Sequence, residues 1–305
     1  MKASIERVKL MNALSHVHGV VERRNTIPIL SNVLIEAKNN KLLLTATDME
    51  IAEVESADCM SEQDGSITTS AHMLHDIVKK LPDNASVELE SVEDSKLEVR
   101  SNRITFTLMC LPSEDFPAIT SGDFPEGFSM ENKDLRRLID KTLFSVSTEE
   151  TRYYLNGIYF HAAEDNDTEV IRAVATDGHR LSRLSAKLPD QAKGMEGVIV
   201  PRKTVVELRK LLDSQDGKTK IQITKTKIKF GIGQVILTSK LLDGSFPDYQ
   251  RVIPEGNTKE LSLNTKAFTE AVDRVSTVST DRTRGIKFLL SKDRLVISAE
   301  NPEQG

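Results

Sequence analysis

The residue pair most suggestive of catalysis is Asp177 and His179, in the segment ATDGHRLS. A carboxylate close to a histidine could act as an acid–base pair. Alternate positions on a strand do not guarantee contact, and no nucleophile accompanies them. Asp48 holds the matching place in the similar segment ATDMEIAE, where Met49 and Glu50 follow it. An aspartate in both segments indicates a turn, since its carboxylate accepts nearby backbone N–H groups. A hydrolase using Asp177 and His179 is therefore the minor alternative.

Metal and redox chemistry have little support in the sequence. Cys59 and Cys110 match neither a metal-binding spacing nor a disulfide framework, which favours a reducing compartment. Two histidines three residues apart are expected on one helix, but no cysteine or carboxylate cluster completes a metal site. The histidines are His16, His18, His72, His75, His161 and His179. We expect no metal, no cofactor and no catalytic residue.

Basic and aromatic residues recur in three loops that each follow an apolar, helix-like segment. Arginine can contact phosphates, and tyrosine can stack on an unpaired base or bond a phosphate. The alternative is that the two tyrosines only begin a strand, one buried and one exposed. The residues are Arg23 and Arg24, then Arg152, Tyr153 and Tyr154, then Arg282 and Arg284.

The elements before these loops are predicted helices with apolar residues at i, i+3, i+4 and i+7, typical of one buried helix face. They repeat roughly every 125 to 133 residues, which predicts an array of similar domains. Second helices are predicted at HMLHDIVKKL and RKTVVELRKLL, and alternating runs such as KLLLTATDMEIAEVES predict antiparallel strands. The apolar sets are Leu10, Ala13, Leu14 and Val17; Leu135, Leu138, Ile139 and Thr142; Phe268, Ala271, Val272 and Val275.

Charge is distributed unevenly along the chain, whose 305 residues carry a formal net charge of −5. The predicted helices together are basic and the remainder is acidic. This segregation would let an acidic protein present one positive surface to phosphates, although lysine and arginine also favour helices in general. No run approaches the roughly 18 apolar residues of a membrane span, and the N-terminus has no apolar export segment. We expect a soluble, cytoplasmic protein.

Longer strings resemble the bacterial sliding clamp family, the beta subunits of the replicative DNA polymerase. They include TIPILSNVLIEA, RYYLNGIYF, VATDGHRLS and TSKLLDGSFPDYQRVIP, and they occur in the family's order along the whole chain. The resemblance implies an α+β DNA-clamp fold of three tandem domains, each with two helices packed on antiparallel sheets. The domains would span residues 1–124, 125–255 and 256–305, the third being incomplete.

The resemblance also implies the functional residues. DNA contacts would be Arg24, Tyr153, Tyr154, Arg202, Lys203 and Arg284. A groove for short partner peptides would comprise Leu155, Thr176, Gly178, His179, Arg180, Leu181, Pro247, Arg251 and Val252. Phe106, Leu108 and Val278 would lie at the interface between subunits.

By the same resemblance, the protein would, when full length, encircle double-stranded DNA as a head-to-tail homodimer ring and confer processivity without being an enzyme. Its partners would be the replicative polymerase, a clamp loader, and other polymerases and repair proteins with short peptide motifs. Because the third domain is short, we expect this form not to close a stable ring. The alternative is a clamp-derived scaffold that binds peptides without forming a ring.

Overall fold

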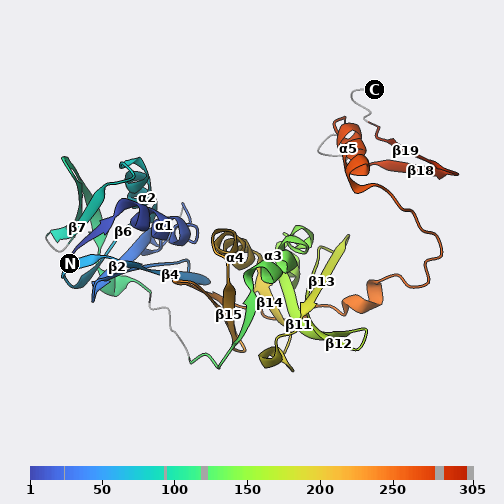
Figure 1. The fold of residues 1–305 in the computed structure, drawn as a ribbon, viewed down its shortest axis with the longest axis horizontal. Helices are drawn as coiled ribbons and strands as arrows, with labels where there is room; N and C mark the ends of the chain where they lie inside the picture. The colour runs from blue at the N-terminus through green and yellow to red at the C-terminus, as the bar shows by residue number, and fades with distance from the viewer. Residues whose placement is uncertain (24, 93–94, 118–122, 279–284, 301–305) are drawn as a thin grey trace. The chain divides into compact units, whose positions relative to one another are not determined.

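The computed structural model describes residues 1–23, 25–92, 95–117, 123–278 and 285–300 of the chain (Figure 1). The chain divides into two compact units, Met1–Pro247 and Asp248–Gly305. The first unit contains two successive halves with similar sets of helices and strands.

The first half has helices α1 (Arg7–Val17) and α2 (Ala71–Lys80), which pack beside each other over the strands (Figure 1). Short 3₁₀ turns lie at Pro28–Ser31 and Ser113–Asp115. The strands are β1 (Lys2–Glu6), β2 (Asn32–Lys38), β3 (Lys41–Thr47), β4 (Ile51–Asp58), β5 (Met60–Gln63), β6 (Gly65–Ser70), β7 (Ser86–Val92), β8 (Lys96–Ser101) and β9 (Ile104–Leu111).

The second half repeats this arrangement with α3 (Asn132–Asp140) beside α4 (Arg202–Ser214). Its 3₁₀ turns are Leu143–Ser145, Glu150–Leu155 and Asp190–Ala192. The strands are β10 (Phe128–Glu131), β11 (Gly157–Asp165), β12 (Thr168–Thr176), β13 (Leu181–Lys187), β14 (Val198–Pro201), β15 (Lys218–Ile223), β16 (Lys227–Ile232) and β17 (Val235–Lys240).

The strand order confirms the repeat that the sequence predicts. In the first half the strands run β4-β3-β2-β6, and in the second half β13-β12-β11-β14. A further group runs β9-β8-β7-β1 in the first half and β17-β16-β15-β10 in the second. Neighbouring strands in these groups pair antiparallel. The predicted α+β class, with two helices on antiparallel sheets in each copy, is confirmed.

One strand pairing joins the two halves. β17 of the second half pairs with β4 of the first, in a register that runs from Val235 opposite Glu55 to Ser239 opposite Ile51. Among the described residues this pairing completes a sheet of 13 strands. The halves therefore share backbone hydrogen bonds in addition to side-chain contacts.

The predicted helix faces supply much of the core of the first unit. In α1 all four predicted residues are buried, and so are Leu135, Leu138 and Ile139 of α3. Thr142 is also buried, but it lies beyond the end of α3, where its hydroxyl donates to the Leu138 carbonyl at 2.7 Å. Burying these apolar faces against the sheets supplies the main favourable term for each half.

The second unit is small. It contains a 3₁₀ turn (Tyr249–Val252), helix α5 (Thr265–Ser276) and a hairpin of β18 (Lys287–Ser291) and β19 (Arg294–Ser298). Asn264 caps α5 by accepting the Ala267 N–H at 3.0 Å, and the rings of Phe268 and Phe288 are 5.7 Å apart. The predicted apolar face of α5 is present, but its side chains are only partly covered.

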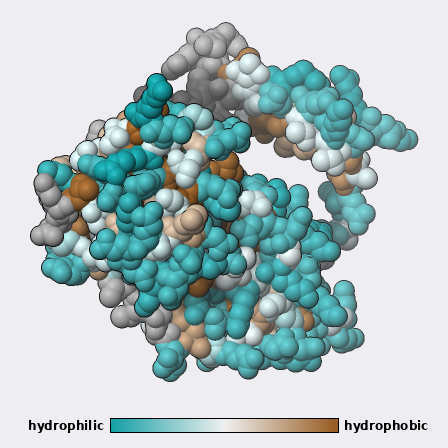
Figure 2. Space-filling model, turned by 60° about the vertical axis from the view of Figure 1, so that its left-hand side comes forward, coloured by the Kyte–Doolittle hydropathy of each residue, from teal (hydrophilic) through white to brown (hydrophobic). Residues whose placement is uncertain are grey.

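Hydrophilic residues dominate the face drawn in Figure 2, where apolar residues form small separate patches. In the part of the chain that the structure describes, no helix is long and apolar enough to cross a membrane.

Candidate nucleic-acid and partner interface

The turn between β12 and β13 is held by Thr176 and Asp177. The Asp177 carboxylate accepts the N–H groups of His179 and Arg180, both at 2.9 Å. The Thr176 hydroxyl accepts the Gly178 N–H at 3.1 Å and donates to the Arg180 carbonyl at 2.8 Å. Gly178 has φ +88°, a left-handed conformation that favours glycine. The turn therefore presents His179 and Arg180 on the surface.

The bonding of Asp177 argues against acid–base chemistry at this turn. Hydrogen bonds from the backbone N–H groups of Arg180 and His179 hold the pKa of the Asp177 carboxyl down at about 2. Its second oxygen accepts from the Arg180 guanidinium at 3.0 Å. The carboxylate is thus charged and committed to the turn, as the comparison with Asp48 predicts.

A pocket of about 550 Å³ lies beside this turn. His179 and Arg180, both predicted for the partner groove, line it together with Arg202, a predicted DNA contact. The Arg180 guanidinium lies over the Phe144 ring, 5.7 Å from its centroid. The remaining lining residues are Asp140, Leu143, Val146, Ser147, Thr148, Glu149, Asp177 and Arg209. The two predicted sites therefore meet in one cavity with basic, acidic and apolar walls.

The loop that carries the two tyrosines packs against this turn. Tyr153 and Tyr154 lie in the 3₁₀ turn Glu150–Leu155, before β11 begins at Gly157. The alternative that they begin a strand is therefore wrong. The Tyr153 side chain is half-exposed, and the two rings meet edge to face at 5.8 Å. Arg152, paired with Glu149, lies so close to Gly178 that a Cβ there would be 2.7 Å from its Nη1.

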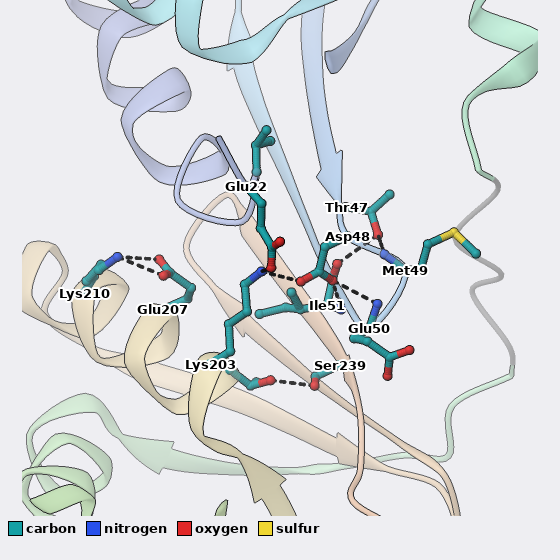
Figure 3. Close-up of polar contacts among 12 residues, drawn as sticks. Glu22, Thr47, Asp48, Met49, Glu50, Ile51, Lys203, Glu207, Lys210 and Ser239 are labelled. Atoms are coloured by element: carbon teal, nitrogen blue, oxygen red, sulfur yellow. Dashed lines mark hydrogen bonds and ion pairs between the residues drawn. The ribbon is translucent and has the colours of Figure 1, made fainter. Parts of the chain in front are cut away.

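Arg202 and Lys203 open helix α4 and differ in environment. Arg202 is exposed, whereas the Lys203 ammonium contacts two carboxylates of the first half (Figure 3). Glu22 lies 3.0 Å from it and Asp48 bonds it directly. Burial alone would lower the pKa of Lys203, but the hydrogen bonds that its ammonium donates to Asp48 and Glu22 outweigh burial, and the pKa is raised. Lys203 therefore stays charged and links the two halves.

The turn that supplies Asp48, drawn in Figure 3, repeats the hydrogen bonds from backbone N–H groups found in the turn at Asp177. Asp48 accepts the N–H groups of Glu50 and Ile51 at 2.9 and 2.8 Å, and Thr47 accepts the Met49 N–H at 3.0 Å. Met49 has φ +77°, close to the value of Gly178. The second oxygen of Asp48 accepts a hydrogen bond from Lys203 of the other half. The second oxygen of Asp177 accepts one from Arg180 of the same turn. The turn-forming role predicted for both aspartates is confirmed.

A group of buried carboxylates lies where α1, β4 and α4 meet. His16 on α1 pairs with Glu55 at 2.7 Å. Glu53 is fully buried, and neither of its oxygens has a hydrogen-bond partner among the described residues. Burial is the main reason that the pKa of Glu53 rises to about 8. Glu207 of α4 lies against Gly19, where a Cβ would be 2.5 Å from its Oε2. The glycine permits this close approach of the halves.

Sequence reasoning missed this junction, although a signal existed. Glu53 and Glu55 occupy alternate positions of an apolar strand, on the same face as Ile51. Carboxylates in core register indicate an interface with polar partners. The stacking of His18 on His75, with ring centroids 4.2 Å apart, was likewise missed. His18 caps the end of α1 and His75 lies in α2, so no local pattern relates them.

The other predicted site residues are placed as follows. Leu155 is buried, Thr176 and Leu181 are half-buried, and Pro247 is exposed at the end of the first unit. Arg251 and Val252 are exposed in the second unit, where Arg251 pairs with Asp248 at 2.9 Å. On β9, Phe106 is exposed and Leu108 is buried, and Val278 of the second unit is exposed. Arg24 and Arg284 lie outside the described residues.

Three consecutive segments match the domains of one family. Residues 1–120 match the N-terminal domain of the DNA polymerase III beta subunit, residues 129–248 its central domain, and residues 250–305 its C-terminal domain. The beta sliding clamp of Caulobacter vibrioides is 45% identical over 306 residues, which cover the whole chain and 82% of that protein. The beta sliding clamp of Escherichia coli K12 is 37% identical with the same coverage.

Solved structures agree with these matches. The crystal structure of a DnaN sliding clamp from Bartonella birtlesii bound to griselimycin superposes with a TM-score of 0.96 at 48% identity, over the whole chain and 82% of that structure. The Pseudomonas aeruginosa clamp bound to griselimycin has a TM-score of 0.92 at 40% identity, with the same coverage.

Proposed function

Since the chain belongs to the beta sliding clamp family of DNA polymerase III, we propose that it encircles double-stranded DNA as a head-to-tail homodimer ring and tethers the replicative polymerase. The observation that carries this proposal is the match of three consecutive segments to the family's three domains. We assign the domains to residues 1–124, 125–255 and 256–305. A ring holds DNA by enclosure, so each phosphate contact can stay weak and exchangeable while the ring slides.

The proposed DNA contacts are basic and aromatic residues of loops and helix starts. The exposure of Arg202 and Tyr153 supports the assignment. Contacts of this kind position a duplex without reading its bases, which suits a protein that must move along any sequence. The set is Arg24, Tyr153, Tyr154, Arg202, Lys203 and Arg284.

The proposed partner groove takes short extended peptides with apolar anchors, from the polymerase and from other replication and repair proteins. It is supported by the pocket beside His179 and Arg180, where Phe144 and Leu143 offer apolar contact. The set is Leu155, Thr176, Gly178, His179, Arg180, Leu181, Pro247, Arg251 and Val252. Phe106, Leu108 and Val278 are proposed for the interface between subunits.

The proposed activity is mechanical and requires no catalytic residue or cofactor. The engagement of Asp177 in its turn supports this assignment over hydrolysis. A clamp loader would open the ring, and replication places the protein in the cytoplasm.

Retention on nicked circular DNA, compared with the same DNA made linear, tests enclosure. A ring is retained on the circle and lost from the free ends, whereas a protein that adheres to the DNA surface is retained equally on both. Equal retention would contradict the proposal.

Two substitutions separate the two proposed surfaces. Arg24→Ala, a residue of the proposed DNA set alone, should reduce the slope of log affinity against log salt for duplex DNA by about one and leave peptide binding unchanged. His179→Ala should weaken binding of a polymerase-derived peptide by about 5- to 30-fold and leave the DNA slope unchanged. Lys193→Ala, an exposed lysine paired with Glu169, is the charge-matched control. Equal effects of both substitutions in both assays would contradict the division.

A further inference from the structure

Lys203 is a proposed DNA contact whose charge is already engaged within the protein. Its ammonium lies 3.0 Å from Glu22 and also bonds Asp48 (Figure 3). An ammonium has three donors, so these two carboxylates occupy most of its hydrogen-bonding capacity. Its neighbour Arg202 is exposed at the pocket described above. A phosphate that approaches the start of α4 therefore meets two cations. Arg202 is accessible, whereas Lys203 is already paired with two carboxylates.

The two carboxylates that hold Lys203 are not equivalent. The Asp48 side chain is 10% exposed and its other oxygen is bonded by the backbone of its own turn. The Glu22 side chain is 58% exposed and lies in the loop after α1. An ion pair with an exposed partner contributes little free energy and is readily exchanged. Asp48 is thus a fixed partner of Lys203, and Glu22 is one that an incoming anion can replace.

We propose that Glu22 is a built-in competitor for DNA: it occupies Lys203 while no duplex is present and releases it to a backbone phosphate when the duplex approaches. This inference rests on the proposed function, because it assumes that α4 faces the duplex. A phosphate diester carries the same single charge as the carboxylate and accepts the same hydrogen bonds, so the exchange is nearly balanced. Near balance keeps the contact weak, as sliding requires.

The exchange also affects the link between the halves. Glu22 belongs to the first half and Lys203 to the second, so DNA binding would break one of the two ion pairs at this point while the pair with Asp48 remains. DNA would therefore loosen the contact between the loop after α1 and α4 at Lys203, while the contact between Gly19 and Glu207 remains.

A double-mutant cycle tests the inference. Affinity for a short duplex is measured against salt for the unmodified protein, Glu22→Gln, Lys203→Met and the double variant, with thermal unfolding as the check on folding. We expect Glu22→Gln to raise affinity several-fold at low salt, because Lys203 no longer has to leave the Glu22 carboxylate before it binds a phosphate. In the Lys203→Met background the same substitution should change affinity by less than about twofold, the residual effect of removing a negative charge.

Two results would overturn the inference alone. One is an equal effect of Glu22→Gln with and without Lys203, which would reflect general charge removal. The other is no effect of Glu22→Gln while Lys203→Met weakens binding. A different result would overturn the proposed function and this inference together: neither the unmodified protein nor any variant binds duplex in a salt-dependent way. The rate of chemical labelling of the Lys203 amine provides a second measurement. Glu22→Gln should raise this rate, and added duplex should lower the rate in the Glu22→Gln variant.

Discussion

At the scale of single residues, the third position of the repeated turn decides how much strain each copy carries. Gly178 and Met49 both have positive φ in turns with the same hydrogen bonds. A side chain in the left-handed region costs about 1 to 2 kcal/mol, which glycine avoids. The Met49 side chain is also half-exposed, so its packing offsets little of this cost.

Met49→Gly should therefore raise the free energy of unfolding by about 0.5 to 1 kcal/mol, the relief of strain less the greater entropy of glycine in the unfolded chain. Urea unfolding measures this difference. Met60→Gly is the control, since Met60 is 73% exposed on the extended strand β5 and has no strain to relieve. That control should lose stability, and a loss in Met49→Gly as well would show that the turn is not strained.

Residue-scale features differed in how far sequence could predict them. The role of the two aspartates followed from comparing the copies, because a turn is bonded within a few residues. The pairing of Lys203 could not be predicted, since its partners Asp48 and Glu22 lie 155 and 181 positions away. Only the packing of the two halves brings them together.

At the scale of helices and strands, periodicity predicted where the helices lie and which faces they bury. It worked for α1 and α3 because their apolar residues lie on one helix face that is buried. It missed β4 as a junction strand, because Glu53 and Glu55 interrupt the apolar face. The cost of burying Glu53 in the charged form keeps it protonated at neutral pH.

Glu53→Gln should alter the pH dependence of stability. The pKa of Glu53 is about 8 in the folded protein, against 4.5 for an ordinary glutamate. Between these values the unfolded chain releases a proton that the folded protein retains, so stability falls as pH rises and levels off above the folded pKa. The substitution should remove this fall, on the order of a few kcal/mol.

Urea unfolding at intervals from pH 5 to pH 9 measures the difference between the two proteins. Glu36→Gln, on β2, makes the same chemical change at a half-buried site and is the control. Parallel profiles for Glu53→Gln and the unmodified protein would mean that Glu53 is solvated in the folded protein.

At the scale of the whole chain, the repeat and the family resemblance predicted similar domains, but not how successive domains join. The sheet that runs through β17 and β4 supplies that join in the first unit. Strand register between halves depends on their relative position, which no local pattern encodes. Because backbone hydrogen bonds cross the junction, the two halves of the first unit should unfold together.

Ile236→Pro should uncouple them. Ile236 lies opposite Val54 in the joining pair, its side chain is 44% exposed, and proline disrupts an interior ladder. We expect urea unfolding of the first unit to change from one cooperative transition to two. Met60→Pro, on the outermost strand β5, should preserve a single transition. Persistence of one transition in Ile236→Pro would show that side-chain contacts alone couple the halves.

The end of the shorter sheet has a consequence for selective assembly. β13 occupies the same topological place as β4, yet it is the terminal strand of its four-stranded sheet in the described part of the chain. The exposed edge of such a strand can pair with a strand of another chain. Arg183 and Lys187 project from it, exposed and positively charged. Electrostatic repulsion should therefore turn away basic β-segments and favour acidic ones, which limits nonselective aggregation at this edge.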